Sequence, residues 1–289
     1  MVSKGELLKF RMMTFTPQKR VPGGAQKALF IVLLLLTACS TRSYVVSDRH
    51  NAAKNLNLRG NESYFRGDYA AAAKLYDRAL ALAMEIDDRA GMAESLNNLG
   101  QLYVEAGELP SAQEKFLKAG LLNGEIKNKK GLAVNLNNSG TVLRLQGNYE
   151  AAAAEFEKAL GLARDAGDKS GCAVITNNLG LLALDQGEAA RARKYFEEAL
   201  ASAKSLKQHR LAAACLQNLG GLAEREGKLD EAIAGFSGSI EEDRLAEYSP
   251  GLAKGLEGLG RLFDKKGEPV LSRDYFKRAQ FIKKRLGFK

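Results

Sequence analysis

The fold is decided by residues 133–147, which read AVNLNNSGTVLRLQG. Apolar residues recur there at intervals of three and four positions, as they do along one stripe of an amphipathic helix. A second stripe follows through Ala152, Phe156 and Leu160. Gly147 lies between the two stripes, and Gly readily adopts the left-handed conformation that ends a helix. The stretch therefore predicts a helix, a turn and a second helix.

This unit recurs along the chain with a fixed period of 40 residues and without an insertion or deletion. The recurring residues are one Gly (60, 100, 140, 180, 220 and 260), a second Gly (67, 107, 147, 187, 227 and 267) and an aromatic residue (Tyr76, Phe116, Phe156, Phe196, Phe236 and Phe276). We expect an all-α fold of six repeats, at about 53–92, 93–132, 133–172, 173–212, 213–252 and 253–289. A single repeat cannot bury its apolar face alone, so each repeat must stack on its neighbours.

The register of these residues resembles that of the tetratricopeptide repeat (TPR) family. Small residues precede and follow each aromatic residue at the family's spacing, as Ala152 and Ala159 do around Phe156. The resemblance covers residues 50–289, although Thr176 replaces a Leu of the family pattern and the 40-residue unit is longer than the usual one. It implies a right-handed α-solenoid of six helix–turn–helix repeats.

The N-terminal segment has the features of a bacterial export signal. Six Lys and Arg residues precede an uninterrupted apolar run, Ala28 to Leu36, and small residues follow that run. Counted to Ala38 the segment is roughly half of the ~20 residues that a membrane-spanning helix needs. We therefore expect a signal peptide over residues 1–38, with Met1, Met12 or Met13 as the start.

The end of this segment, Leu36-Thr37-Ala38-Cys39, resembles the lipobox of bacterial lipoproteins. The resemblance implies that Cys39 is acylated, as with palmitate, and becomes the mature N-terminus, followed by a tether over residues 39–49. It also implies an exported protein that is anchored to the membrane. Since Ser40 follows the Cys where an Asp signals inner-membrane retention, the outer membrane is favoured if the host has one. The alternative is ordinary signal cleavage with Cys39 incidental.

The composition argues against nucleic-acid binding and against catalysis. The net charge is +9, but residues 39–289 hold 37 basic and 33 acidic groups, which leaves only +4 for the predicted mature chain. The two histidines, His50 and His209, have no nucleophile at a catalytic spacing. We therefore expect no enzyme activity, no metal, no cofactor and no nucleic-acid partner.

Two adjacent amide-bearing sites recur in the first helices of repeats two to five. The first amide row is Asn97, Asn137, Asn177 and Gln217, and the second amide row is Asn98, Asn138, Asn178 and Asn218. Asn is a poor helix former, so its recurrence in the middle of helices needs a reason. In TPR proteins these helices line a concave groove, and the resemblance implies that both rows, with Arg144, Leu181 and Leu184, bind a peptide there. The alternative is a structural ladder in which the amides join one repeat to the next, and both roles are compatible.

Together these features predict a membrane-anchored TPR scaffold that binds a protein or peptide partner of the cell envelope through its concave groove. Assembly of an envelope complex is the process we expect it to serve. The alternative is a structural module that forms homo-oligomers and has no external peptide ligand. The residues do not identify the partner or the envelope process.

Overall fold

The computed structural model describes residues 46–287. The chain divides into two units, Met1–Ser47 and Asp48–Lys289, and the helical array belongs to the second unit. The predicted signal peptide and Cys39 lie outside the described residues. Residues 46–49, which the sequence assigned to the tether, are already helical. The array thus begins before residue 50, because Arg49 pairs with Glu85 of the next helix.

The described residues form helices joined by short turns, and none of these residues is in a strand. A first helix covers residues 46–65 and is followed by α2 to α12, each of 17 residues. Their bounds are α2 Tyr69–Glu85, α3 Arg89–Glu105, α4 Leu109–Glu125, α5 Lys129–Leu145, α6 Tyr149–Asp165, α7 Lys169–Asp185, α8 Ala189–Ser205, α9 His209–Arg225, α10 Leu229–Leu245, α11 Ser249–Lys265 and α12 Pro269–Arg285. The predicted six helix pairs and the all-α fold are confirmed, with the second to sixth pairs beginning four residues earlier than expected and the first helix described from residue 46.

The turn within each repeat is set by its second recurring Gly. Gly147 has a φ of 80°, in the left-handed region, and its N–H donates to the carbonyl of Arg144 at 3.0 Å. The turns between repeats have the same geometry, but most place another residue there, such as Lys127 with a φ of 56°. Because every turn has three residues, the 40-residue period of the sequence becomes a constant geometric step.

The core consists of the recurring aromatic residues beneath closely packed helices. Phe156 and Ala159 are fully buried, and they form one cluster with Ala133 and with Ile175 of the next repeat. A Cβ added to Gly140 would lie 2.9 Å from the Phe156 ring, so the first recurring Gly is needed for this approach. Each cluster thus joins one repeat to the following one, as expected for a solenoid.

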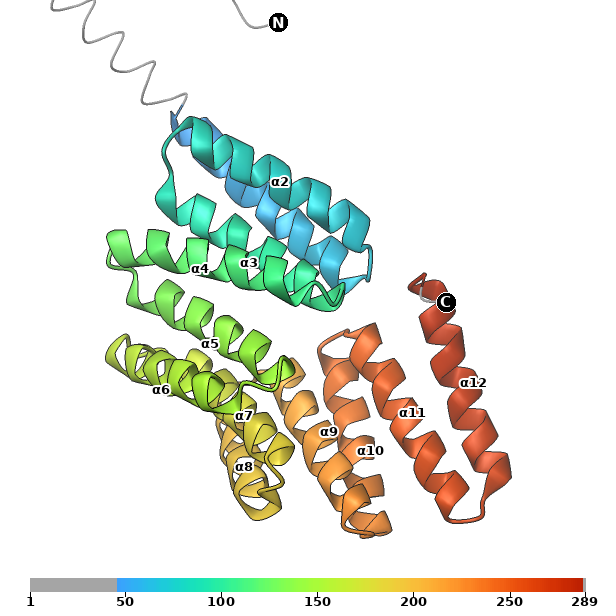
Figure 1. Cartoon of the computed structure of the whole chain (residues 1–289). Helices are drawn as coiled ribbons and strands as arrows, with labels where there is room; N and C mark the ends of the chain where they lie inside the picture. Colours follow the sequence, from blue (N-terminus) through green and yellow to red (C-terminus); the bar gives the residue numbers. More distant parts are fainter. Residues whose placement is uncertain (1–45, 288–289) are drawn as a thin grey trace, which may run out of the picture. The chain divides into compact units, whose positions relative to one another are not determined.

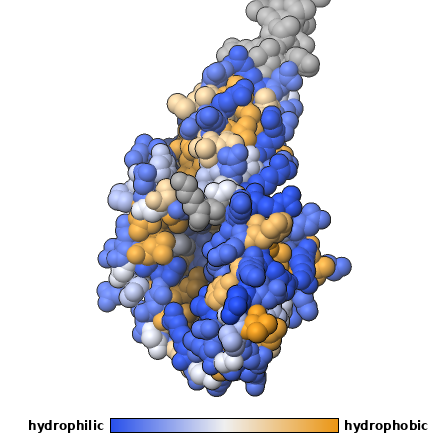
Figure 2. Space-filling view, turned by 90° about the vertical axis from the view of Figure 1, so that its right-hand side faces the viewer, coloured by the Kyte–Doolittle hydropathy of each residue, from blue (hydrophilic) through white to orange (hydrophobic). Residues whose placement is uncertain are grey.

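The pairs follow one another along a curved path from the first helix to α12 (Figure 1). α12 is the last helix of the described residues, and its Val270 and Phe281 are 78% and 63% exposed. The face on that side shows separate apolar patches among hydrophilic atoms (Figure 2). Six basic residues and one acidic residue on α12 make this end of the array polar.

No helix among the described residues is long and apolar enough to cross a membrane.

Candidate ligand groove

The two amide rows form hydrogen bonds from each repeat to the preceding one. The Nδ2 of Asn138 donates to the Oδ1 of Asn97 at 2.8 Å. The same bond recurs one repeat later from Asn178 to Asn137, at 2.8 Å, and again from Asn218 to Asn177, at 3.0 Å. These contacts form the ladder that the sequence left as one of two alternatives.

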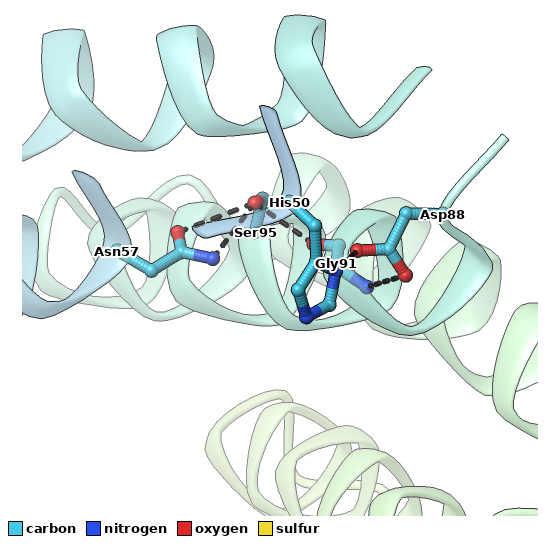
Figure 3. A network of polar contacts seen from close by, with 5 residues as sticks. All are labelled: His50, Asn57, Asp88, Gly91 and Ser95. Carbon is cyan, nitrogen blue, oxygen red and sulfur yellow. Dashed lines mark hydrogen bonds and ion pairs between the residues drawn. The ribbon is translucent and has the colours of Figure 1, made fainter. Parts of the chain in front are cut away.

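A second set of contacts reaches the first amide row from the next repeat. It comes from the residue that lies three positions before the second-row Asn of that repeat. The Nδ2 of Asn135 donates to the Oδ1 of Asn97 at 3.1 Å, and the Sγ of Cys215 lies 3.5 Å from the Oδ1 of Asn177. In the first repeat Asn57 occupies the corresponding site and bonds Ser95 at 3.1 Å (Figure 3). Sequence reasoning missed Asn57 and Asn135, although the 40-residue register connects them to the rows.

The ladder does not use the whole hydrogen-bonding capacity of the amides. The Oδ1 atoms of Asn178 and Asn218 accept no hydrogen bond from the described residues, and both side chains are half-buried. The Nδ2 of Asn98 is buried and has no partner among these residues. An amide oxygen left free in this way can accept from the backbone N–H of a bound segment. The ladder and a ligand-binding role are therefore compatible for the second row.

Gln217 ends the first amide row and differs from its other members. It is buried, and its Nε2 donates to the Oδ2 of Asp243 and to the carbonyl of Gly251, both at 3.2 Å. Burial raises the pKa of Asp243 to about 7, although the bond from Gln217 and the charges of Lys254 and Arg210 act in the opposite direction. This end of the row is thus occupied by internal contacts.

The other predicted groove residues make contacts within the array. Arg144 pairs with Asp185 of the next repeat, and Arg144 Nε is buried without a hydrogen-bond partner. Leu181 and Leu184 are half-buried and pack against the cluster around Phe196. In the described structure Arg144 connects two repeats, and Leu181 and Leu184 pack on the buried residues of their own repeat. Whether these three side chains also contact a ligand stays a prediction.

A cavity of about 430 Å³ lies over the first helices of repeats one to three. Its lining includes Asn97 of the first amide row and exposed Val134, together with charged groups of both signs. The basic groups are Lys54 and Lys130 and the acidic groups are Asp88 and Glu94, and the imidazole of His50 lies beside them. Sequence reasoning did not identify this charged rim.

The rim is held by contacts between neighbouring repeats. His50 Nδ1 lies 2.7 Å from the Oδ2 of Asp88, whose Oδ1 accepts from the N–H of Gly91 at 3.0 Å (Figure 3). Burial raises the pKa of Glu94 despite the opposing charge of Lys54. The cavity thus offers acidic and basic groups beside an apolar one, which suits a mixed polypeptide segment.

A second cavity, of about 360 Å³, adjoins Val174, which occupies the place of Val134 one repeat later. The two valines are 37–38% exposed. Because they share one register position on successive first helices, they lie on the same face of the array.

Comparison with known proteins places the repeats in a family. Two models, each described as tetratricopeptide repeat, match residues 51–119 with 131–205, and residues 177–250. None of the curated proteins compared with the chain matches it.

Solved structures share the fold at low identity. The apo form of RapI is 15% identical with a TM-score of 0.62, and the match covers 82% of this chain and 85% of RapI. BtubC (BKLC) from P. vanneervenii is 19% identical with a TM-score of 0.56, over 82% and 92% of the two chains. The Rap conjugation gene regulator of plasmid pLS20, in complex with the Phr* peptide, is 21% identical with a TM-score of 0.52, over 80% and 73%. The repeats, the all-helical array and the family models agree, and the chain belongs to the tetratricopeptide repeat family.

Proposed function

We propose that this protein is a lipid-anchored TPR scaffold that holds a protein or peptide partner of the cell envelope in its concave groove. The observation that carries the proposal is the cavity beside Val134, where an apolar side chain, Asn97 of the first amide row and charges of both signs meet. An extended segment with apolar and charged side chains fits this lining. The free Oδ1 atoms of Asn178 and Asn218 would accept from its backbone.

The fold itself is known to accommodate such a partner. The pLS20 Rap protein, which shares the fold, was solved with the Phr* peptide. At 21% identity this likeness concerns the fold alone, and the binding residues proposed for this chain are its own. That the protein is not an enzyme stays a prediction. Among residues 46–287 no group of three or more His, Cys, Asp and Glu side chains is placed to hold a metal.

The membrane anchor is supported by the Leu36-Thr37-Ala38-Cys39 pattern and by the apolar run before it. An acylated protein with more than one lipid chain stays stably on a membrane, whereas one chain binds only marginally. Anchoring would confine the groove to partners close to the membrane, and the absence of Asp after Cys39 favours the outer membrane of a diderm host.

Site-specific photo-crosslinking in cells tests the groove. A photoreactive residue at Val134 or Val174 should give a discrete adduct with a partner. The matched control is Leu121, which is 69% exposed on α4, a second helix of its repeat, and outside both cavities. Adducts of equal yield from Leu121 would contradict a groove site.

The same experiment separates the homo-oligomer alternative. Two differently tagged copies are expressed together, and the adduct from Val134 is examined for both tags. An adduct that contains both tags at the mass of two chains would show that a second copy fills the groove. An adduct with one tag and a different protein supports the scaffold.

A further inference from the structure

The end of the first helix touches the fifth and sixth repeats across the curved array. Phe65, the last residue of the first helix, packs edge-to-face on Tyr248, with ring centroids 6.3 Å apart and an interplanar angle of 88°. The guanidinium of Arg210, in the first turn of α9, lies 3.6 Å from the Phe65 centroid and 5.1 Å from that of Tyr248. These three residues come from three different repeats, and repeats two to four separate the first from the other two.

A cavity of about 390 Å³ lies at this meeting point. From the first and second repeats it is lined by Tyr64, whose hydroxyl donates to the Oε1 of Glu105 at 3.0 Å. From the fifth and sixth repeats it is lined by Ala214 and Lys254. These two residues hold the register position of Val134 and Val174, which is the exposed position of the groove. The first repeat therefore lies opposite the groove face of the last two repeats, where Ala214 is half-buried and Lys254 stays exposed.

The contact is of a different kind from those between neighbouring repeats. Neighbours share buried clusters and the amide ladder, whereas Phe65 is 37% exposed and Arg210 is exposed. None of the buried apolar clusters of the described residues contains Phe65 or Tyr248. A cation over aromatic rings at an exposed site is a weak interaction. It can separate while every repeat stays folded, because the ladder and the clusters do not depend on it.

We propose that Phe65, Arg210 and Tyr248 form a latch that closes the curved array on itself and partly masks the groove face of repeat five at Ala214. In the closed state the groove is available over repeats one to three, beside Val134. Opening the latch exposes Ala214, which is half-buried in the closed array, and extends the accessible groove over repeat five. The closure of the latch is a property of this chain alone. Only the idea that the uncovered face binds a partner rests on the proposed function.

Distance measurement between spin labels tests the closure without a partner. The labels are placed by Arg66→Cys and Ser249→Cys in the full chain that carries Cys39→Ser and Cys172→Ser. Both labelled sites are exposed, and Cys215 is fully buried and can stay. We expect one narrow short-distance population in the parent. Phe65→Ala and Arg210→Ala should each move the main population to longer and broader distances, and Arg210→Lys, which keeps the charge but loses the planar group, should give an intermediate result.

A matched control has the same chemistry inside one helix. Arg285 lies over the Phe281 ring on α12, at 5.8 Å from its centroid, and joins no separate repeats. Phe281→Ala should leave the distances unchanged, and circular dichroism should show the same helix content in all variants. Distances that are identical in the parent, Phe65→Ala and Arg210→Ala would overturn the latch.

Thiol reactivity tests the masking separately. In the chain with Cys39→Ser and Cys172→Ser, Ala214→Cys should react with a maleimide several-fold faster once Phe65→Ala is added, while Val134→Cys reacts at the same rate with or without it. An unchanged rate at residue 214 would overturn the masking even if the labels move apart. Neither measurement contains a partner, so a failure of the proposed partner binding leaves both results interpretable.

Discussion

The Nδ2 of Asn138 donates to the Oδ1 of Asn97 across 41 residues of sequence, and both atoms belong to the middle of first helices in adjacent repeats. The bond is repeated twice along the array with almost the same length. Amides that are unfavourable for a helix are therefore retained because they connect one helix to the next.

Asn177→Ala should lower the stability of the array. The Oδ1 of Asn177 accepts from Asn218 and is approached by Cys215, and its side chain is only 6% exposed. Losing it leaves partly buried groups unpaired, at a cost of about 1–3 kcal/mol, although Ala itself favours a helix. Thermal unfolding measures the change. The control is Asn148→Ala at an exposed helix start whose side chain makes no capping bond; an equal loss in both variants would argue against the ladder.

Gly100→Ala and Gly161→Ala should change stability in opposite directions. A Cβ at residue 100 would lie 2.6 Å from the ring of Phe116, so the core must shift, and overpacking of this kind costs roughly 1–3 kcal/mol. A Cβ at residue 161 meets nothing within 4 Å. That substitution should stabilise α6 by up to about 1 kcal/mol through helix propensity. Denaturant unfolding compares the two, and a stabilised Gly100→Ala would disprove the close approach.

Asp243→Asn should remove a pH dependence of stability. The pKa of Asp243 is raised from 3.8 to about 7, chiefly by burial, so the folded state holds this proton more tightly than the unfolded chain. The group therefore favours folding most at low pH, and its contribution falls by up to about 1.4 kcal/mol for each unit between the two pKa values as the pH rises. The melting temperatures of wild type and Asp243→Asn should thus diverge as the pH rises from about 4 to 7, because the melting temperature of the wild type falls relative to that of the variant. Parallel curves would show that Asp243 is already ionised.

Cys39→Ser should release the protein from the membrane fraction. Only a Cys thiol at the end of the lipobox-like segment accepts the lipid, so Ser leaves the mature chain unacylated. Metabolic labelling with a fatty acid, followed by fractionation, measures incorporation and location together. Cys172→Ser serves as the control, because Cys172 lies on α7 within the array. A wild-type protein without label would contradict the anchor.

The sequence predicts the local structure of this array because each repeat is a local unit. The period, the turn at Gly147 and the burial of Phe156 follow from residues within one or two repeats. The hydrogen-bond partners of the amides could not be predicted in this way, because the same Asn pattern suits both a ladder and a ligand. Leu181 and Leu184 were assigned to the groove by family register, and the structure adds that they pack on the core around Phe196, so their contact with a ligand stays a prediction.

The contact of Phe65 with Arg210 has no sequence signal. It depends on a small rotation between successive repeats that accumulates over the array, and no single repeat encodes that sum. The two residues also occupy different places in their helices, one at the end and one at the start. Periodicity therefore could not bring them together.

Closure of this kind makes the array sensitive to its own length. Duplication or deletion of one 40-residue unit would preserve every bond between neighbours, and in an open solenoid such a change only lengthens or shortens the molecule. Here such a change would separate Phe65 from Arg210, because their contact requires a fixed number of repeats between them. The aromatic contact can thus form only when the array has its present number of repeats. Recombination between units, which the constant period otherwise tolerates, would break this contact and open the array.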